Sequence, residues 1–145
     1  MKKILSLAIV ATMIASPAFA SGDVEAGKKV FKKCVACHQI GEGAKNKTGP
    51  ILNNVFGRTA GTLEGYKYSK AMIAAGEEGL VWTEETLAQW AAKPKNLVKK
   101  TKMAFAGLKK EEDILNLEAY MLTFSPDYVA QEGEGDEDDS DKKSD

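Results

Sequence analysis

Apolar residues recur at helical spacing near the beginning of the chain, after a short leader. The spacing predicts a helix over residues 23–36, with Asp23 as an N-cap whose carboxylate accepts from the free amides of the first turn. One face of this helix is apolar and the other carries lysines. The apolar face consists of Gly27, Val30, Phe31 and Cys34.

Three more helices are expected further along the chain. A short one covers 69–75 and ends at Gly76, and a clearer one is capped by Thr83 and stopped by Pro94. The last runs over 109–123 and begins with three acidic residues, which suit the helix dipole. Its apolar stripe consists of Leu117, Tyr120, Met121 and Phe124.

The segments between these helices have no sustained hydrophobic period. Residues 39–67 are rich in Gly, Lys, Asn and Thr, and residues 95–108 are irregular and basic. No strand-like alternation of useful length is present, so the fold class is all-α. So much irregular chain in a small domain needs something besides its own side chains to pack on.

The two ends of the chain differ from the body. Residues 1–20 combine two lysines, an apolar run and an Ala-Phe-Ala ending, the pattern of a cleaved signal peptide. Residues 21–131 form one domain with 16 Lys and Arg against 13 Asp and Glu, a net +3. Residues 132–145 have 2 Lys against 8 acids, a net −6, and are expected to be a disordered tail. This balance argues against nucleic acid as a partner.

All the cysteine and histidine of the chain lies in one pentapeptide, Cys34-Val35-Ala36-Cys37-His38. In an exported protein this motif indicates covalent attachment of haem c, with the thiols of Cys34 and Cys37 bonded to the porphyrin and His38 bound to iron. A buried porphyrin also supplies the apolar surface that the long loops require. Without another histidine, a site held by two protein histidines is excluded.

Three other interpretations of the motif fit less well. A thioredoxin-like pair needs flanking strands, which the pattern does not predict. A zinc site needs a fourth donor, normally from a second Cys or His pair, and none exists. A disulfide between Cys34 and Cys37 closes too small a loop to stabilise the fold much.

The second axial position on the iron is open to Met, Lys, water or no ligand. Of the three methionines after the leader, Met72 and Met121 lie on predicted helices, where packing explains them. Met103 lies in an irregular basic segment, where an apolar side chain needs another reason. Sulfur donation to iron supplies one.

Several motifs now agree in order along the chain. They are Cys34–His38, Lys47-Thr48-Gly49-Pro50, Phe56-Gly57-Arg58, Gly65-Tyr66-Lys67-Tyr68, Trp82, and the run from Lys100 through Met103 to Gly107. Over 22–124 the chain thereby resembles the small class I cytochromes c of the mitochondrial and bacterial cytochrome c2 type. The resemblance implies a small all-α fold of helices and long loops wrapped around one covalent haem c.

The resemblance also implies roles for individual residues. Cys34 and Cys37 hold the haem, and His38 and Met103 are the axial ligands of its iron. Pro50 would supply the carbonyl that orients His38. Arg58, Tyr68 and Trp82 would donate hydrogen bonds to a buried haem propionate, and Thr101 would be a polar residue on the distal side. Gly27 and Phe31 are expected to meet Leu117 and Tyr120 where the first and last helices cross.

Two positions depart from the pattern of the family. Trp90 stands where many relatives have Tyr near the Met ligand, and Met72 stands where many have Asn near the haem. Both changes remove polar groups from the distal side. They affect the expected reduction potential and leave the ligands unchanged.

The expected function is one-electron transfer rather than enzymatic catalysis, because two protein ligands leave no open iron position. The protein is expected to be a periplasmic monomer that exchanges electrons with membrane redox complexes and has no small-molecule substrate. Its docking surface is a lysine-rich face. That face consists of Lys33, Lys47, Lys93, Lys95, Lys99, Lys100, Lys102 and Lys109.

Two alternatives stay open at this point. A haem whose distal ligand is displaceable would act as a peroxidase or gas sensor. The acidic tail either covers the lysine-rich face or keeps the protein in solution.

Overall fold

The computed structural model describes residues 22–130, which contain five helices. These are α1 (Val24–Phe31), α2 (Lys70–Glu77), α3 (Glu84–Ala92), α4 (Pro94–Leu97) and α5 (Glu111–Leu122). Over that range the only β pairing is an isolated bridge between Thr59 and Val81, so the all-α prediction is confirmed. The predicted signal peptide (1–20) and acidic tail (132–145) lie outside the described residues.

The first helix begins as predicted and ends earlier. The Asp23 side chain accepts from the amide of Ala26, which confirms the N-cap. The helix ends at Phe31 instead of near residue 36, because the following amides bond three residues back. Cys34 N donates to Phe31 O at 2.8 Å, and Cys37 N donates to Cys34 O at 3.1 Å. The tighter turns carry the Cys34–His38 motif on irregular backbone.

The middle helices also start at predicted caps. Ser69 accepts from the amide of Met72, and Thr83 accepts from the amide of Thr86 in a reciprocal capping box. Pro94 was expected only to end α3, and the basic segment after it was expected to be irregular. That prediction is wrong for residues 95–97, because Pro94 starts α4. Proline is compatible with the first helical position, where its missing N–H has no partner to lose.

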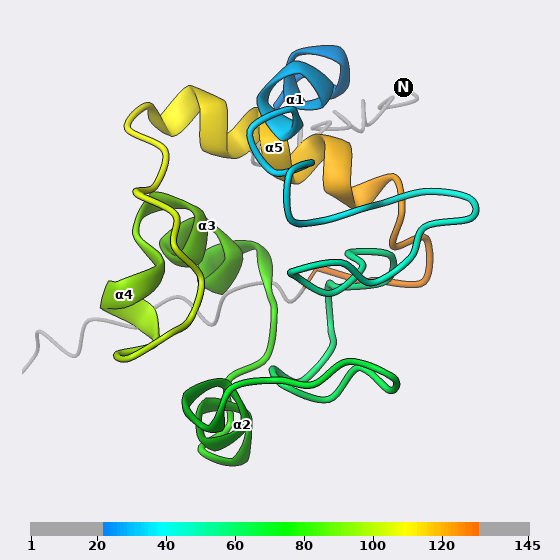
Figure 1. The fold of residues 1–145 in the computed structure, drawn as a ribbon. Helices are drawn as coiled ribbons and strands as arrows, with labels where there is room; N and C mark the ends of the chain where they lie inside the picture. The colour runs from blue at the N-terminus through cyan, green and yellow to red at the C-terminus, as the bar shows by residue number, and fades with distance from the viewer. Residues whose placement is uncertain (1–21, 131–145) are drawn as a thin grey trace, which may run out of the picture.

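Helices α1 and α5 cross at the top of the molecule in Figure 1, with α3 and α4 on one side and α2 at the opposite end. A Cβ on Gly27 would lie 1.8 Å from the carbonyl oxygen of Asn116, so only glycine permits this approach. The rings of Phe31 and Tyr120 lie 5.4 Å apart at the same crossing. The predicted meeting of Gly27 and Phe31 with Tyr120 is confirmed. Lys33 and Asp113 form an ion pair at 3.4 Å beside it.

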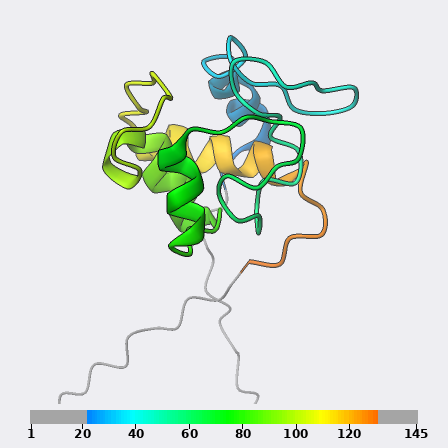
Figure 2. The same ribbon diagram turned by 60° about the horizontal axis from the view of Figure 1, so that its bottom comes forward.

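The long loop after α1 is fixed to the rest of the fold by backbone hydrogen bonds. Asn54 N donates to Phe124 O at 2.8 Å, and Ala60 N donates to Leu80 O at 2.8 Å. Figure 2 shows this loop region running alongside α5 and α2, and it contains no helix. The loop therefore forms a wall of the domain.

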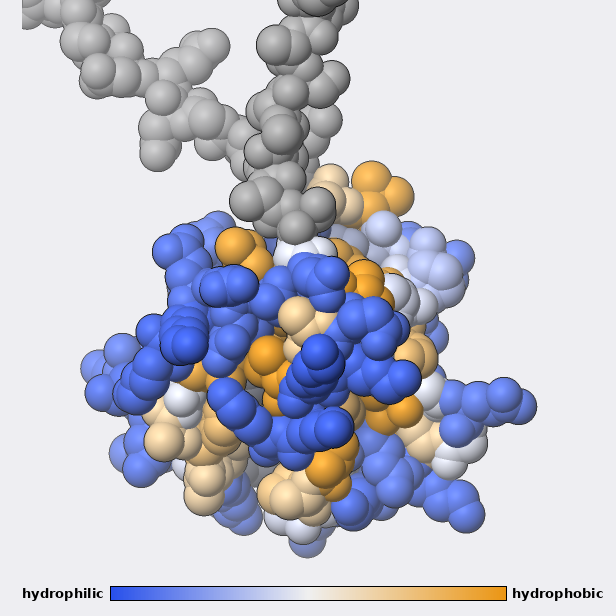
Figure 3. Space-filling view, turned by 90° about the horizontal axis from the view of Figure 1, so that it is seen from above, coloured by the Kyte–Doolittle hydropathy of each residue, from blue (hydrophilic) through white to orange (hydrophobic). Residues whose placement is uncertain are grey.

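The buried core draws on four helices and on the segments between them, and Pro94 of α4 is also fully buried. Its members come from α1, the long loop, α2, the segment before α3, α3, the segment between α4 and α5, and α5: Val30, Phe31, Val55, Phe56, Ala60, Met72, Trp82, Leu87, Ala91, Val98, Leu108, Leu117 and Met121. The face that carries α1 and α5 is largely hydrophilic, with apolar patches between charged side chains (Figure 3). Of the predicted apolar stripe of the last helix, Leu117 and Met121 are buried, and Tyr120 and Phe124 are partly buried.

Candidate haem site

The two cysteines lie one turn apart, directly after α1. Both thiols are free, so the disulfide alternative is not formed in this structure. Cys34 is partly buried and Cys37 is exposed. Burial raises the pKa of the Cys34 thiol to about 11, Lys33 lowers it and Cys37 raises it. Within residues 22–130 no group of three or more His, Cys, Asp or Glu could hold a metal ion, which leaves the zinc alternative without a site.

His38 is oriented by the segment that ends in Pro50. The Nδ1 atom of His38 lies 2.7 Å from the carbonyl oxygen of Pro50. A carbonyl can only accept, so Nδ1 carries the proton and Nε2 keeps its free lone pair. Burial lowers the pKa of His38, and the bond to Pro50 acts in the opposite direction. A neutral ring with a free Nε2 is the form that binds a metal.

Gly49 lies against the imidazole ring of His38. A Cβ at this position would lie 2.3 Å from Cε1 of His38, so any other residue would displace the imidazole. The amide of Gly49 donates to Cys37 O at 2.8 Å and joins this loop to the cysteine motif. The sequence shows Gly49 as part of a motif and does not reveal its contact with His38. No local pattern identifies which side chain a loop glycine will meet.

Met103 lies on the irregular segment between α4 and α5 and is partly buried. Its amide donates to the Thr101 hydroxyl at 3.2 Å, so Thr101 shapes the turn that presents Met103. By contrast, Met72 is 8% exposed and Met121 is 3% exposed, and both belong to the core. The structure therefore agrees with the packing explanation for these two methionines.

Arg58, Tyr68 and Trp82 lie close together. The guanidinium of Arg58 donates to Asn53 O at 3.2 Å, and Trp82 N donates to Arg58 O at 3.0 Å. Burial lowers the pKa of Arg58, and the nearby Tyr68 opposes that shift. Burial likewise raises the pKa of Tyr68, and Arg58 lowers it. The cluster presents donors with no carboxylate bonded to them among the described residues.

The two tryptophans meet beside this cluster. The rings of Trp82 and Trp90 are 5.4 Å apart in an edge-to-face arrangement. Trp82 is buried, at 8% exposed, and Trp90 is partly buried. Trp90, the departure noted in the sequence, thus packs on a residue of the expected haem-contacting set.

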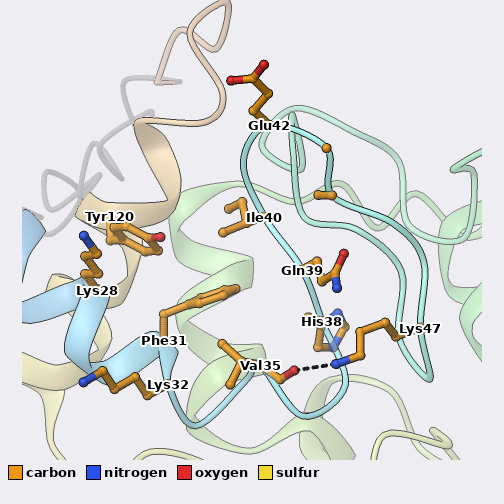
Figure 4. A pocket seen from close by; sticks show the side chains of 12 residues that line it. Lys28, Phe31, Lys32, Val35, His38, Gln39, Ile40, Glu42, Lys47 and Tyr120 are labelled. Carbon is orange, nitrogen blue, oxygen red and sulfur yellow. Dashed lines mark hydrogen bonds between the residues drawn. The ribbon is translucent and has the colours of Figure 1, made fainter.

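A groove of about 450 Å³ lies on the outer side of the cysteine motif, between α1, Tyr120 and the loop at 38–47. Figure 4 shows Phe31, Val35 and Ile40 on its floor and Lys28, Lys32 and Lys47 around it. The Lys47 ammonium donates to Val35 O at 2.9 Å across one edge. The groove shares only His38 with the expected haem-contacting residues, so it is not the haem crevice.

All eight lysines of the predicted docking face are exposed. Two of them are engaged within the protein, because Lys33 pairs with Asp113 and Lys47 bonds to Val35 O. The remaining six lie on α4, on the segments that flank Met103, and directly before α4 and α5.

Residues 24–125 match the family model described as Cytochrome c. The chain belongs to the cytochrome c family. It is 58% identical over 104 residues to "Cytochrome c2" of Afifella marina, covering 72% of this chain and 84% of that relative. It is 51% identical over 106 residues to "Cytochrome c-550" of Nitrobacter winogradskyi, covering 73% and 94% of the two chains.

A solved structure shows the same family relationship. Cytochrome c2 from Rhodospirillum centenum superposes with a TM-score of 0.69 at 40% identity, covering 72% of this chain and all of that one. The predicted small all-α cytochrome c fold is therefore confirmed. Membership of the family makes this protein a carrier of covalent haem c that transfers electrons and is not an enzyme.

The residues of the candidate site fit a covalently bound haem c. Two free thiols one turn apart precede an imidazole whose free Nε2 is set by the bond to Pro50. The side chains of Arg58 and Tyr68, which bond to backbone carbonyls and to no carboxylate among the described residues, accompany them. This set matches the needs of a porphyrin with two attachment points, an iron and charged propionates. No described helix is long and apolar enough to cross a membrane.

Proposed function

We propose that this cytochrome c is a periplasmic one-electron carrier whose haem iron is held between His38 and Met103. Haem c supplies the redox change when bound, and the chain holds and shields it. The observation that carries this proposal is the 2.7 Å bond between His38 and Pro50, which leaves one imidazole nitrogen free beside two unpaired thiols. Cys34 and Cys37 are the attachment points.

On the proximal side, Pro50 keeps the His38 ring in one orientation. Because Nε2 of this ring carries no proton, it is available to bind the iron in both the ferrous and the ferric state. Gly49 leaves no room for the ring to turn, since its Cα side faces Cε1 of His38. The geometry around the iron then changes little on electron transfer, which keeps the reorganisation small.

On the distal side, Met103 is the donor and Thr101 shapes its turn. The segment is anchored at its far end, where Leu108 N donates to Ala91 O at 2.8 Å. A thioether is neutral, so it stabilises the ferric charge less than an anionic ligand does and raises the reduction potential. Two firmly held ligands leave no site for oxygen or peroxide.

Arg58, Tyr68 and Trp82 are proposed to bind a buried haem propionate. A carboxylate away from water needs several donors. The side chains of Arg58 and Tyr68 lie near each other on the long loop, and the backbone of Trp82, in the segment before α3, bonds to that of Arg58. These side chains also cover the edge of the haem and exclude water from it. Exclusion of water disfavours the extra charge of the ferric state.

The lysine-rich face is proposed to dock acidic surfaces of membrane redox complexes. The six lysines that have no partner among residues 22–130 supply its long-range charge. Such a face accelerates association at low ionic strength and loses this advantage as salt rises. The protein is proposed to act as a soluble monomer after removal of residues 1–20.

An absorption spectrum with a redox titration tests the ligand set. Wild-type protein is expected to show a low-spin spectrum with a sulfur-to-iron band in the oxidised form. Met103→Ala is expected to lose that band, lower the potential and bind carbon monoxide when reduced. Met72→Leu and Met121→Leu are the matched controls and are expected to keep the band.

A Met103→Ala variant that keeps the low-spin spectrum would refute the assignment of Met103. Rapid carbon monoxide binding by reduced wild-type protein would instead favour a haem with a displaceable ligand, the peroxidase or gas-sensor alternative.

A further inference from the structure

The carboxyl group of Glu118 is buried in α5 without a partner. The residue is 6% exposed, and its Oε1 atom has no hydrogen-bond donor. Lys33–Asp113 is the single ion pair within residues 22–130, so no cation of the described residues pairs with Glu118. A carboxylate that loses its hydration without gaining a partner is costly to keep ionised. None of the ligand, propionate or docking roles uses this side chain.

The charges around Glu118 add to that cost. Helix α5 packs against α1 and α3. Burial raises the pKa of Glu118 to about 7, and repulsion from Glu84 of α3 contributes to the rise. Among the charged side chains of these three helices, only Glu84 shifts the pKa of Glu118. The others are Glu25, Lys28, Lys29, Glu85, Glu111, Glu112 and Asp113. No neighbour therefore favours the ionised form.

Helix α3 connects this carboxyl to the segment that carries Met103. Leu108 N donates to the carbonyl of Ala91 at 2.8 Å. A Cβ on Gly107 would lie 1.8 Å from the carbonyl oxygen of Ala92, so the segment is in close contact with the end of α3. The end of the segment that carries Met103 is therefore attached to the end of α3.

We propose that Glu118 is a proton-operated lock between α3 and α5. The neutral acid packs between the helices. The carboxylate repels Glu84 and draws water into the interface, which releases α3 together with residues 101–108. That this release also weakens a bond from Met103 to iron rests on the proposed function; the lock itself does not.

The lock is tested with holoprotein and its Glu118→Gln variant, which keeps the shape and removes the charge. The free energy of unfolding in urea is measured from pH 5 to pH 8, with hydrogen-exchange protection factors for 84–92 and 101–108. A carboxyl whose pKa is higher in the folded state stabilises at low pH, and this stabilisation is lost as pH rises through about 7. The unfolding constant of wild type is expected to rise on the order of fifty-fold more than that of the variant.

Further variants distinguish the role of Glu118 from the effect of removing any acidic side chain. Glu112→Gln removes an exposed acid from the same helix and is expected to keep the wild-type pH profile. Glu84→Gln removes the repulsion and so lowers the pKa of Glu118 in the folded state; the loss of stability is expected to be smaller and to be complete at lower pH. Glu118→Leu repeats the test with an apolar side chain, should the Gln variant fold poorly.

Equal pH slopes for wild type and Glu118→Gln would overturn the lock. Unchanged protection at 101–108, with a changed slope, would overturn the connection through α3. Neither readout depends on which residue binds iron, so loss of the Met103 assignment would leave the lock standing, and the reverse also holds.

Discussion

The carbonyl of Pro50 accepts a hydrogen bond from Nδ1 of His38 at 2.7 Å. These residues are twelve positions apart, and the bond selects one tautomer of the only histidine in the chain. The amide of Gly49 donates to the carbonyl of Cys37 and holds the two segments together. A backbone carbonyl and a glycine thus determine which nitrogen can bind iron.

Gly49→Ala should displace the His38 ring. The new methyl group would lie 2.3 Å from Cε1, so the imidazole or the loop must move. We expect a loss of stability of about 3 kcal/mol, together with a changed spectrum in the oxidised form. Urea unfolding and absorption spectra measure the two effects.

Gly43→Ala is the control for that substitution. It adds the same methyl group with no atom within 4 Å, although its φ of 69° is strained for alanine. That strain costs about 1–2 kcal/mol and should leave the spectrum unchanged. Identical spectra for the Gly49 and Gly43 variants would contradict the orienting role of Gly49.

Replacing both cysteines with alanine should abolish covalent attachment. The chain has only two cysteines, so no other thiol can substitute for them. Mass spectrometry of denatured wild type should show the polypeptide plus one haem, and the double variant should show polypeptide alone. A haem mass retained by the denatured double variant would disprove the attachment at Cys34 and Cys37.

Removal of the haem should unfold most of the domain. The long loop has little helix of its own and supplies few core residues, so the polypeptide buries limited apolar surface without the porphyrin. Circular dichroism of haem-free chain should show much less helix than that of the holoprotein. A native-like spectrum would show that the helices pack stably on one another alone.

Gly27→Ala should separate α1 from α5. Its Cβ would lie 1.8 Å from the carbonyl oxygen of Asn116, and a backbone atom cannot turn aside as a side chain can. We expect a loss of about 3 kcal/mol or more, measured by urea unfolding. Lys29→Ala, at an exposed position of the same helix, should change stability by less than about 0.5 kcal/mol. Similar effects of the two variants would refute the close approach.

Replacing Lys95, Lys99 and Lys102 with glutamine should slow electron exchange with an acidic surface. At an electrode coated with a carboxylate-terminated monolayer, we expect about a tenfold slower rate at low ionic strength and a weaker dependence on salt. Glutamine at the exposed Lys45, Lys67 and Lys70 makes the same change in net charge elsewhere. Equal effects of the two triple variants would show that net charge, rather than a defined face, controls docking.

The covalent chemistry and most of the helices follow from local sequence. Cys34, Cys37 and His38 identify their cofactor by spacing alone, because attachment and ligation need those groups within one turn. Asp23 and Thr83 mark helix starts because capping is a contact between residues close in the chain. The short helix α4 is not predicted by the sequence, because Pro94 both ends one helix and begins the next.

Long-range contacts required the folded chain. Packing decides that Gly49 faces His38 and that Gly27 faces Asn116, and nothing near either glycine in the sequence states its neighbour. Glu118 appears in the sequence as one acid among several on an amphipathic helix. Only the folded chain buries it and brings Glu84 near enough to repel it, because burial is a property of the whole fold and not of the helix that carries the residue.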